Sequence, residues 1–338
     1  MFSPASIAPA EANLACRLTA PGTSGLAVVR IVGPRVRGFL QSYFSRTAAV
    51  GKCVHGELRE ESGRVIDDPV VVLLPGGRIA DLSLHGGTWI VQATLSLLQR
   101  AGFELVAELD PALLYPEIGD PLEQRILALL PRASTDLALR ALLAQIDAWR
   151  GFHPTAQQLQ KLQQDRALHH LLNPPTVAIV GPVNAGKSTL ANRLLAQDRS
   201  IVADVPGTTR DWVAERVDLD GLPVLLIDTP GQRQTDDALE HEAITRSLAR
   251  IGSADLVLLV LDATRPLEPE QAPLLARYPS ALRIVNKCDQ PVVFDTKSLS
   301  AICIAAGPGI GLEHLVMAIQ QYFGVWRMDF HRPRWIPE

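Results

Sequence analysis

Short apolar runs alternate with helical segments between Thr176 and Phe323, and this alternation restricts the possible folds more than any other feature of the sequence. The runs are TVAIVG, PVLLIDT, ADLVLLVLDA, ALRIVNK and AICIAA, and a last helix is predicted from Leu312 to Phe323. Strands that are separated by helices pair in parallel, and their sheet needs helices on both faces. We therefore predict a doubly wound, mostly parallel α/β domain over residues 174–325.

The rest of the chain separates into three further parts by composition. Short β-branched runs stopped by glycine and proline, GLAVVRIVG, PVVVLLPGG and IADLSLHGG, predict a small α+β domain over residues 1–106. Leucines at helical spacing follow, and LLNPP ends them, so a reduced helical segment is predicted over 107–173. The remaining stretch, 326–338, carries arginines between aromatic residues, and we expect it to be a short, solvated tail.

The composition is that of a globular chain of two or three domains. Its 338 residues are 47% hydrophobic and 20% charged, and the net charge of −4 does not draw the chain to nucleic acid. No apolar run is long enough to cross a bilayer, and the first residues lack the regions of a signal peptide, so we expect a cytoplasmic protein with no membrane partner. Four cysteines without metal-ligand spacing favour reduced thiols: Cys16, Cys53, Cys288 and Cys303.

A phosphate-binding loop is predicted at GPVNAGKST, residues 181–189. The stretch matches G-x-x-x-x-G-K-[ST] in full, and it lies after an apolar strand at the start of a predicted helix. Glycines let backbone N–H groups surround phosphates, and the helix N-terminus adds its positive end. Lys187 is expected to neutralise the outer phosphates and the Ser188 hydroxyl to ligate magnesium. The predicted binding residues are Asn184, Ala185, Gly186, Lys187, Ser188 and Thr189.

Two further loops are predicted to surround the last phosphate of the nucleotide. DVPGTTRD, residues 204–211, offers the hydroxyls of Thr208 and Thr209, and after a phosphate-binding loop it is typical of a first switch. One of these threonines is expected to complete the magnesium shell. DTPG ends a strand, so Asp228 is expected to hold magnesium through water, and the Gly231 N–H to face the terminal phosphate.

The segment NKCD, Asn286 to Asp289, predicts which base is bound. It ends a later strand, where the Asp289 carboxylate can accept two N–H bonds from one edge of guanine while the stem of Lys287 covers the ring. Adenine offers no matching donors, and a buried carboxylate left unpaired costs discrimination of order 10⁴-fold. We infer GTP, not ATP. The loop AAG follows, and the backbone of Ala306 is expected to touch the base.

The motifs together resemble one family, the tRNA-modification GTPases called TrmE or MnmE. The similar segments are GPVNAGKSTL, DVPGTTRD, DTPG, NKCD and TDDALEHEAITRS in the second half of the chain. In the first half, TAPGTSGLAVVRIVGP is similar to the family's opening strand and turn, and LSLHGG to its LQGHGG. The family's long helical segment and closing Cys-x-Gly-Lys tail have no counterpart before Glu338, and AAG replaces the usual Ser-Ala-Lys loop.

The resemblance implies partners and cofactors. Such proteins dimerise through the amino-terminal domain, bind a formyl-tetrahydrofolate there, and modify the wobble uridine of certain tRNAs with a flavoprotein partner. Arg30 matches a folate contact, and Asp81 stands where the family has glutamate. Asn184 matches the asparagine that holds potassium. Ser188 and Thr209 match the magnesium ligands.

Two residues compete for the role of orienting the attacking water. The resemblance assigns the role to Glu240, whereas Gln232 directly follows DTPG, at the position where Ras-like enzymes keep a glutamine. The predicted catalytic set is therefore Glu240, Gln232, Lys187 and Thr209.

Three functions stay open at this point. The first is a GTPase that hydrolyses GTP to GDP and phosphate in wobble-uridine modification, with Mg²⁺ and K⁺. The second is a GTP-dependent switch that binds RNA, a ribosome or a protein and no longer modifies tRNA. The third is a nucleotide-binding scaffold without turnover, against which the complete set of predicted nucleotide-binding residues argues.

Overall fold

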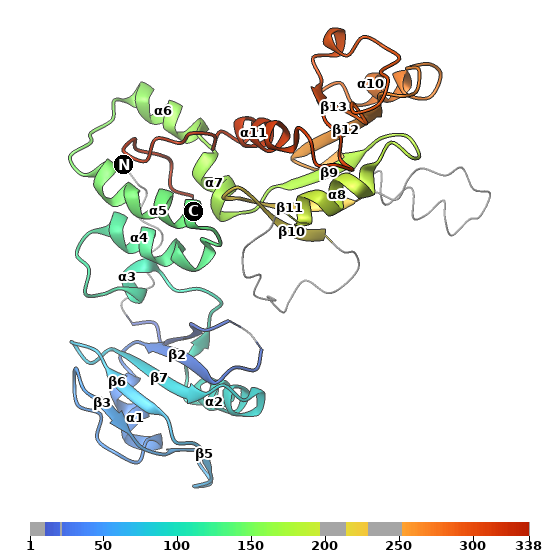
Figure 1. The fold of residues 1–338 in the computed structure, drawn as a ribbon. Helices are drawn as coiled ribbons and strands as arrows, with labels where there is room; N and C mark the ends of the chain where they lie inside the picture. Colours follow the sequence, from blue (N-terminus) through green and yellow to red (C-terminus); the bar gives the residue numbers. More distant parts are fainter. Residues whose placement is uncertain (1–10, 21, 197–213, 229–251, 338) are drawn as a thin grey trace. The chain divides into compact units, whose positions relative to one another are not determined.

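The computed structural model describes residues 11–20, 22–196, 214–228 and 252–337. The chain divides between Ala128 and Leu129 into two compact units (Figure 1). Unit 1 precedes this point and unit 2 follows it. Among the described residues, no helix combines the length and the apolar character that a bilayer span requires.

Unit 1 is an α+β domain built on one mixed six-stranded sheet. The order across the sheet is β3 (Cys53–His55), β6 (Val70–Leu73), β7 (Ile79–His85), β2 (Leu26–Val32), β1 (Leu14–Arg17) and β8 (Glu104–Leu105). A two-stranded sheet pairs β4 (Leu58–Arg59) with β5 (Val65–Asp67). The helices are α1 (Val36–Tyr43), α2 (Thr88–Arg100), α3 (Pro111–Leu114) and α4 (Pro121–Leu129), the last of which reaches the boundary with unit 2.

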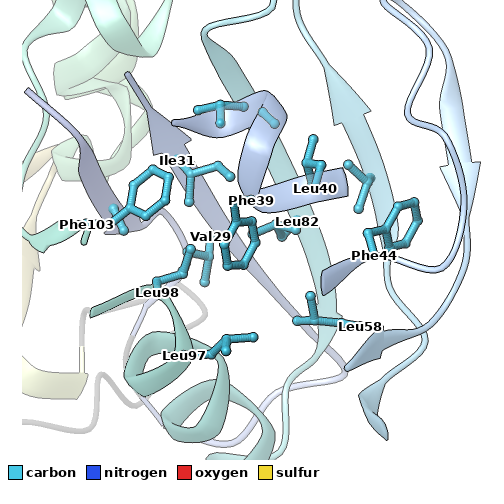
Figure 2. Packing of buried hydrophobic residues seen from close by; sticks show 14 of the residues in the cluster. Val29, Ile31, Phe39, Leu40, Phe44, Leu58, Leu82, Leu97, Leu98 and Phe103 are labelled. Carbon is cyan, nitrogen blue, oxygen red and sulfur yellow. The ribbon is translucent and has the colours of Figure 1, made fainter. Parts of the chain in front are cut away.

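The core of unit 1 lies between this sheet and helices α1 and α2. Alternation along β2 sends Val29 and Ile31 to the core, where they meet Phe39 of α1 and Leu98 of α2 (Figure 2). The residues that alternate with these, Val28, Arg30 and Val32, point to the opposite face, where Val32 packs with Leu109 and residues of α3. Arg30 lies on that second face.

Unit 2 contains the predicted doubly wound sheet, and this confirms the expected fold class. The order is β10 (Ala214–Leu219), β11 (Leu222–Asp228), β9 (Thr176–Val180), β12 (Leu256–Asp262), β13 (Leu282–Asn286) and β14 (Ile302–Cys303). All neighbours pair in parallel except β10 and β11, which form an antiparallel hairpin. The helices that accompany these strands are α8 (Lys187–Ala196), α10 (Ala272–Arg277) and α11 (Leu312–Tyr322), together with a 3₁₀ turn at Lys297–Leu299.

The helical segment that precedes the sheet belongs to unit 2. It comprises a 3₁₀ turn at Leu130–Arg132 and the helices α5 (Asp136–Trp149), α6 (Ala156–Gln164) and α7 (Ala167–Leu172). The Thr135 hydroxyl caps α5 and also donates 2.7 Å to the Gly221 carbonyl in the β10–β11 turn, which attaches the helix to the sheet. The four-part division of the chain stays a prediction.

The expectation of a solvated tail is wrong. Arg334 bonds Asp165 across 2.6 Å, and its backbone N–H donates to the Gln145 side chain. The Trp149 indole N–H donates to the Arg334 carbonyl, and Ile336 is fully buried. The tail therefore crosses α5 and closes the helical segment (Figure 1).

The topology of unit 2 positions a binding site. From β9 the chain passes to β11 on one side, and β12 returns on the other side of β9, so the direction of winding reverses between β9 and β12. In open α/β sheets, ligands bind outside the carboxyl ends of the strands at such a reversal. The phosphate-binding loop follows β9 at this edge.

Candidate nucleotide-binding site

Two glycines give the phosphate-binding loop its path. Gly181 has φ +155° and lies so close to β12 that an added Cβ would be 2.2 Å from the Val260 carbonyl oxygen. Gly186 has φ +92°, and its Cβ would be 2.3 Å from the side-chain nitrogen of Asn286. A side chain at either position would displace neighbouring atoms, so both glycines are required by space as well as by conformation.

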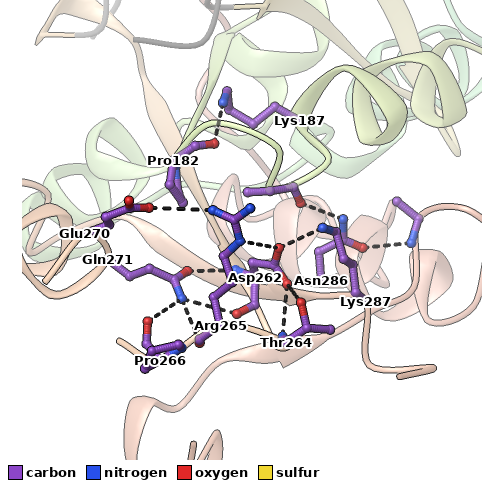
Figure 3. Close-up of polar contacts among 12 residues, drawn as sticks. Pro182, Lys187, Asp262, Thr264, Arg265, Pro266, Glu270, Gln271, Asn286 and Lys287 are labelled. Atoms are coloured by element: carbon purple, nitrogen blue, oxygen red, sulfur yellow. Dashed lines mark hydrogen bonds and ion pairs between the residues drawn. The ribbon is translucent and has the colours of Figure 1, made fainter. Parts of the chain in front are cut away.

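Lys187 begins α8 and is buried beneath the loop. Its ammonium donates to the Pro182 carbonyl at 2.8 Å (Figure 3) and to the Gly181 carbonyl at 3.0 Å. The positive group therefore lies at the helix N-terminus, where the dipole already favours an anion. Ser188 and Thr189 follow in the first turn of α8 with exposed side chains, and Asn184 is exposed in the loop at φ 66°.

Asn286 connects the loop to the base-binding segments. It ends β13 and is buried, its amide donates 2.8 Å to the Ala185 carbonyl, and its side-chain oxygen accepts from the Ala306 N–H at 2.9 Å. One side chain thus bridges three segments that are far apart in sequence. Of the predicted residues, Asn184 to Thr189, Asn286 to Asp289 and Ala306 lie together at this edge of the sheet.

Lys287 is anchored by a buried carboxylate that the sequence analysis missed. The Lys287 ammonium lies 2.7 Å from Asp262, which ends β12 and is 1% exposed (Figure 3). The N–H and hydroxyl of Thr264 donate to the other oxygen of Asp262, and Gln271 accepts from the Asp262 N–H. Burial raises the pKa of the Asp262 carboxyl, but the bonds from Lys287 and Thr264 outweigh it and hold that pKa below its ordinary value.

We predict that Asp262→Asn lowers both the stability and the affinity for guanine nucleotides. Asparagine keeps the shape but leaves Lys287 without its counter-ion, which costs about 1–3 kcal/mol because the ammonium is only partly exposed. Urea unfolding at pH 7 measures this loss, with Asp255→Asn as the matched control, since Asp255 accepts bonds at the opposite end of the strands.

The pH dependence gives a second measure of the same pair. A carboxyl with a lowered pKa in the folded state stabilises fully above its unfolded pKa, and this contribution is lost as the pH falls through the folded value. The wild-type advantage over Asp262→Asn should therefore be constant down to the ordinary pKa of 3.8 and shrink below it. An advantage that shrinks already between pH 7 and 5 would contradict the assignment.

A pocket of about 200 Å³ opens where these segments meet. Asp289 is exposed and is one of the residues that line the pocket, as the guanine assignment requires. The Ala306 N–H, expected to touch the base, donates to Asn286 in this structure. The lining residues are Gly186, Thr189, Asn286, Lys287, Asp289, Gln290, Ala306, Gly307 and Pro308.

Several predicted residues lie outside the described part of the chain, namely Thr208, Thr209, Gly231, Gln232 and Glu240. Of Asp228 the structure describes the backbone, which ends β11 in register with Ile179 of β9. Asp228 thus ends β11, and Ser188 follows β9, the neighbouring strand. Carboxylate and hydroxyl oxygens are ligands that suit Mg²⁺. Their roles stay predictions, as does the potassium role of Asn184.

Arg30 and Asp81 form a pair on the second face of unit 1. They are cross-strand neighbours of β2 and β7, and two 2.7 Å bonds join the guanidinium to the carboxylate. The remaining Arg30 nitrogen donates to the Leu113 and Leu114 carbonyls, and the hydrogen bond to Asp81 raises the pKa of Arg30. With these bonds made and Arg30 buried, the pair offers a folate little open hydrogen-bonding capacity, and we derive no folate step from it.

Family models match a part of each unit. Residues 13–108 match the family model described as the GTP-binding protein TrmE N-terminus, and residues 176–288 match that of the 50S ribosome-binding GTPase. Among solved structures, the chain is similar to the G domain of the T. maritima FeoB iron transporter, at 27% identity and a TM-score of 0.34 over 44% of this chain and 99% of that one.

Curated relatives match most of the chain. The tRNA modification GTPase MnmE of Synechococcus sp. (strain CC9605) is 31% identical over 92% of this chain and 81% of its own length. The protein of the same name from Parasynechococcus marenigrum (strain WH8102) is 32% identical over 90% of this chain and 80% of its own. The chain belongs to the family of tRNA modification GTPases called MnmE or TrmE.

Proposed function

We propose that the chain binds GTP, hydrolyses it to GDP and phosphate, and acts in the cytoplasm in modification of the wobble uridine of tRNA. The observation that carries the nucleotide assignment is one pocket lined both by the phosphate-binding loop and by the NKCD segment. Family membership supports tRNA as the target and, with it, a flavoprotein partner and a homodimer formed through the amino-terminal domain.

Base recognition and charge neutralisation are assigned to different segments of the site. The Asp289 carboxylate accepts the two N–H groups of guanine, and the stem of Lys287, held by Asp262, covers the ring. At the N-terminus of α8, Lys187 exchanges the carbonyls of Gly181 and Pro182 for phosphate oxygens, which binds the nucleotide through a charge that is already positioned.

The oxygen ligands that the sequence predicts suit metal ions. Ser188, Thr209 and Asp228 would hold Mg²⁺, which supplies neutralisation of charge that develops on the phosphates during transfer. Asn184 would hold K⁺ beside the loop. The chain's own contribution is to orient the attacking water through Glu240, with Gln232 as the competing residue.

We predict that Glu240→Ala lowers the GTP turnover number in KCl by roughly 10²–10⁴-fold, because an oriented water is lost. Gln232→Ala is expected to stay within about threefold of wild type, since that residue is not the one assigned to the water. Each variant is the control for the other. Steady-state phosphate release measures both, and turnover in NaCl should be lower than in KCl for the wild type.

The water-orienting residue, the potassium site and the tRNA role can each be contradicted separately. If Gln232→Ala abolishes turnover and Glu240→Ala does not, the two roles are reversed. If NaCl supports the same rate as KCl, Asn184 holds no catalytic potassium. Loss of the modified uridine on deletion of the protein supports the tRNA role.

A GTP-dependent switch is the second candidate. The match of residues 176–288 to the family model named for ribosome binding favours it. This function predicts that the chain associates with ribosomes or RNA in GTP but not in GDP, and that the wobble uridine stays modified when the protein is deleted. Co-sedimentation with ribosomes in each nucleotide distinguishes the two candidates.

A further inference from the structure

Arg193 connects α8 to the loop that forms one wall of the pocket. It lies in the last turn of α8, at the far end of the helix from Lys187. Its Nε donates 3.2 Å to the Ala306 carbonyl, and an Nη nitrogen donates to the Gly307 carbonyl. The AAG loop has neither the serine nor the lysine usual in a Ser-Ala-Lys loop. A guanidinium from another element holds the loop instead.

These bonds fix the direction of one backbone donor. The Ala306 carbonyl and the Gly307 N–H belong to the same trans peptide group, so they point in opposite directions. Holding the carbonyl toward Arg193 therefore turns the Gly307 N–H away from α8. Both residues line the pocket.

The Gly307 N–H is also the backbone donor of this loop that is available to bind the base. The Ala306 N–H is already bound by Asn286, and Pro308 has no N–H. Within the described part of the chain, the Gly307 N–H makes no hydrogen bond. Guanine presents a carbonyl oxygen at its 6-position, whereas adenine presents an amino group there, so a fixed donor distinguishes the two bases.

We propose that Arg193 is a positioning residue for base recognition, which holds the AAG loop so that the Gly307 N–H donates to the 6-oxo group of guanine. The proposal rests on the proposed GTP-binding function and deepens it. Asp289 reads the N–H edge of the base, and the loop held by Arg193 reads the neighbouring oxygen. Arg193 itself touches no nucleotide.

The test compares GDP with 6-thioguanosine diphosphate, which keeps both N–H groups and replaces only the 6-oxo oxygen by sulfur, a weaker acceptor. We expect Arg193→Ala to weaken GDP binding by roughly 5- to 30-fold, because two bonds that hold the loop are lost. Binding of the thio analogue should weaken less, so the preference for GDP shrinks. Arg193→Lys, which keeps a charged donor, should restore part of the preference.

Arg283→Ala is the matched control. Arg283 lies on β13 and donates 3.0 Å to the Leu299 carbonyl, the same kind of bond away from the pocket. It should leave both affinities unchanged. Isothermal titration of the full chain with each diphosphate gives all the values.

Three results would overturn the proposal. Wild-type GDP affinity in Arg193→Ala shows that the loop needs no support from α8. An equal loss for GDP and the thio analogue shows that Arg193 maintains the pocket in general and does not position a donor to the 6-oxo group. A wild-type chain that binds no GDP removes the proposed function as well, whereas the first two results leave it standing.

Discussion

Replacing Asp289 by asparagine is expected to weaken GTP binding by roughly 10²–10⁴-fold, because the asparagine amide donor faces the 2-amino donor of guanine and the remaining bond from the ring N–H loses its charged acceptor. The same change should create affinity for xanthosine triphosphate. Xanthine carries a carbonyl at its 2-position where guanine carries an amino group, and an asparagine amide donates to that carbonyl while its oxygen accepts from the ring N–H. Competition against a fluorescent GDP measures both nucleotides.

A control isolates the contribution of the base. Asp295→Asn changes a carboxylate a few residues away that bonds the backbone of its own loop and does not line this pocket. It should leave GTP and xanthosine triphosphate affinities as in the wild type. An Asp289→Asn chain that keeps its GTP affinity would show that this carboxylate does not read guanine.

Lys187→Ala is expected to lower GTP turnover by roughly 10²–10³-fold, the effect of removing one positioned charge from developing negative charge. The ammonium is buried under the loop and bonded to the Gly181 and Pro182 carbonyls, so its position is set before the nucleotide arrives. Phosphate release under saturating GTP separates the rate from the affinity.

Two further measurements test whether Lys187 neutralises the phosphates. Lys161→Ala removes an exposed lysine of α6 and should have no effect on turnover. Thermal unfolding of Lys187→Ala shows whether the loop has lost stability, since the same ammonium also bonds two carbonyls. Unchanged turnover in a folded Lys187→Ala chain would exclude the phosphate role.

The parallel strands could be predicted because each is a continuous apolar run between turns. The edge strand β10 was not predicted, although its sequence contained a signal. Arg216 to Leu219 alternate polar and apolar residues, and Asp220-Gly221 is a two-residue hairpin turn with both φ angles positive, 52° and 95°. An antiparallel edge strand on a parallel sheet can therefore be predicted from alternation and a hairpin turn. A search for continuous apolar runs does not find it.

The contacts of the tail could not be predicted from the local sequence pattern. Arg334 among aromatic residues is typical of a solvated segment, yet its partners Asp165 and Gln145 lie 169 and 189 residues earlier in the chain. Contacts over that separation depend on how α5 and α6 are placed. The spacing of residues in the sequence does not predict this placement.

The site likewise contains residues that local motifs predict and residues that they do not. Lys187, Asn286 and Asp289 could be predicted because contiguous motifs place them at strand ends. Asp262 and Arg193 were not, because their roles arise from neighbours across the sheet: β12 beside β13, and α8 beside the loop after β14. A charged residue ending the apolar run LVLLVLD was the available signal for Asp262.

The central claim is that this pocket selects a guanine nucleotide for hydrolysis. Phosphate release by the full chain with Mg²⁺ and KCl, measured for GTP and for ATP at equal concentration, tests it most directly. We predict turnover of GTP that falls roughly 10²–10³-fold in Lys187→Ala, and turnover of ATP at least roughly 10³-fold lower than that of GTP, since adenine cannot satisfy Asp289. Equal turnover of the two nucleotides, or GTP turnover that is unchanged in Lys187→Ala, would contradict the account.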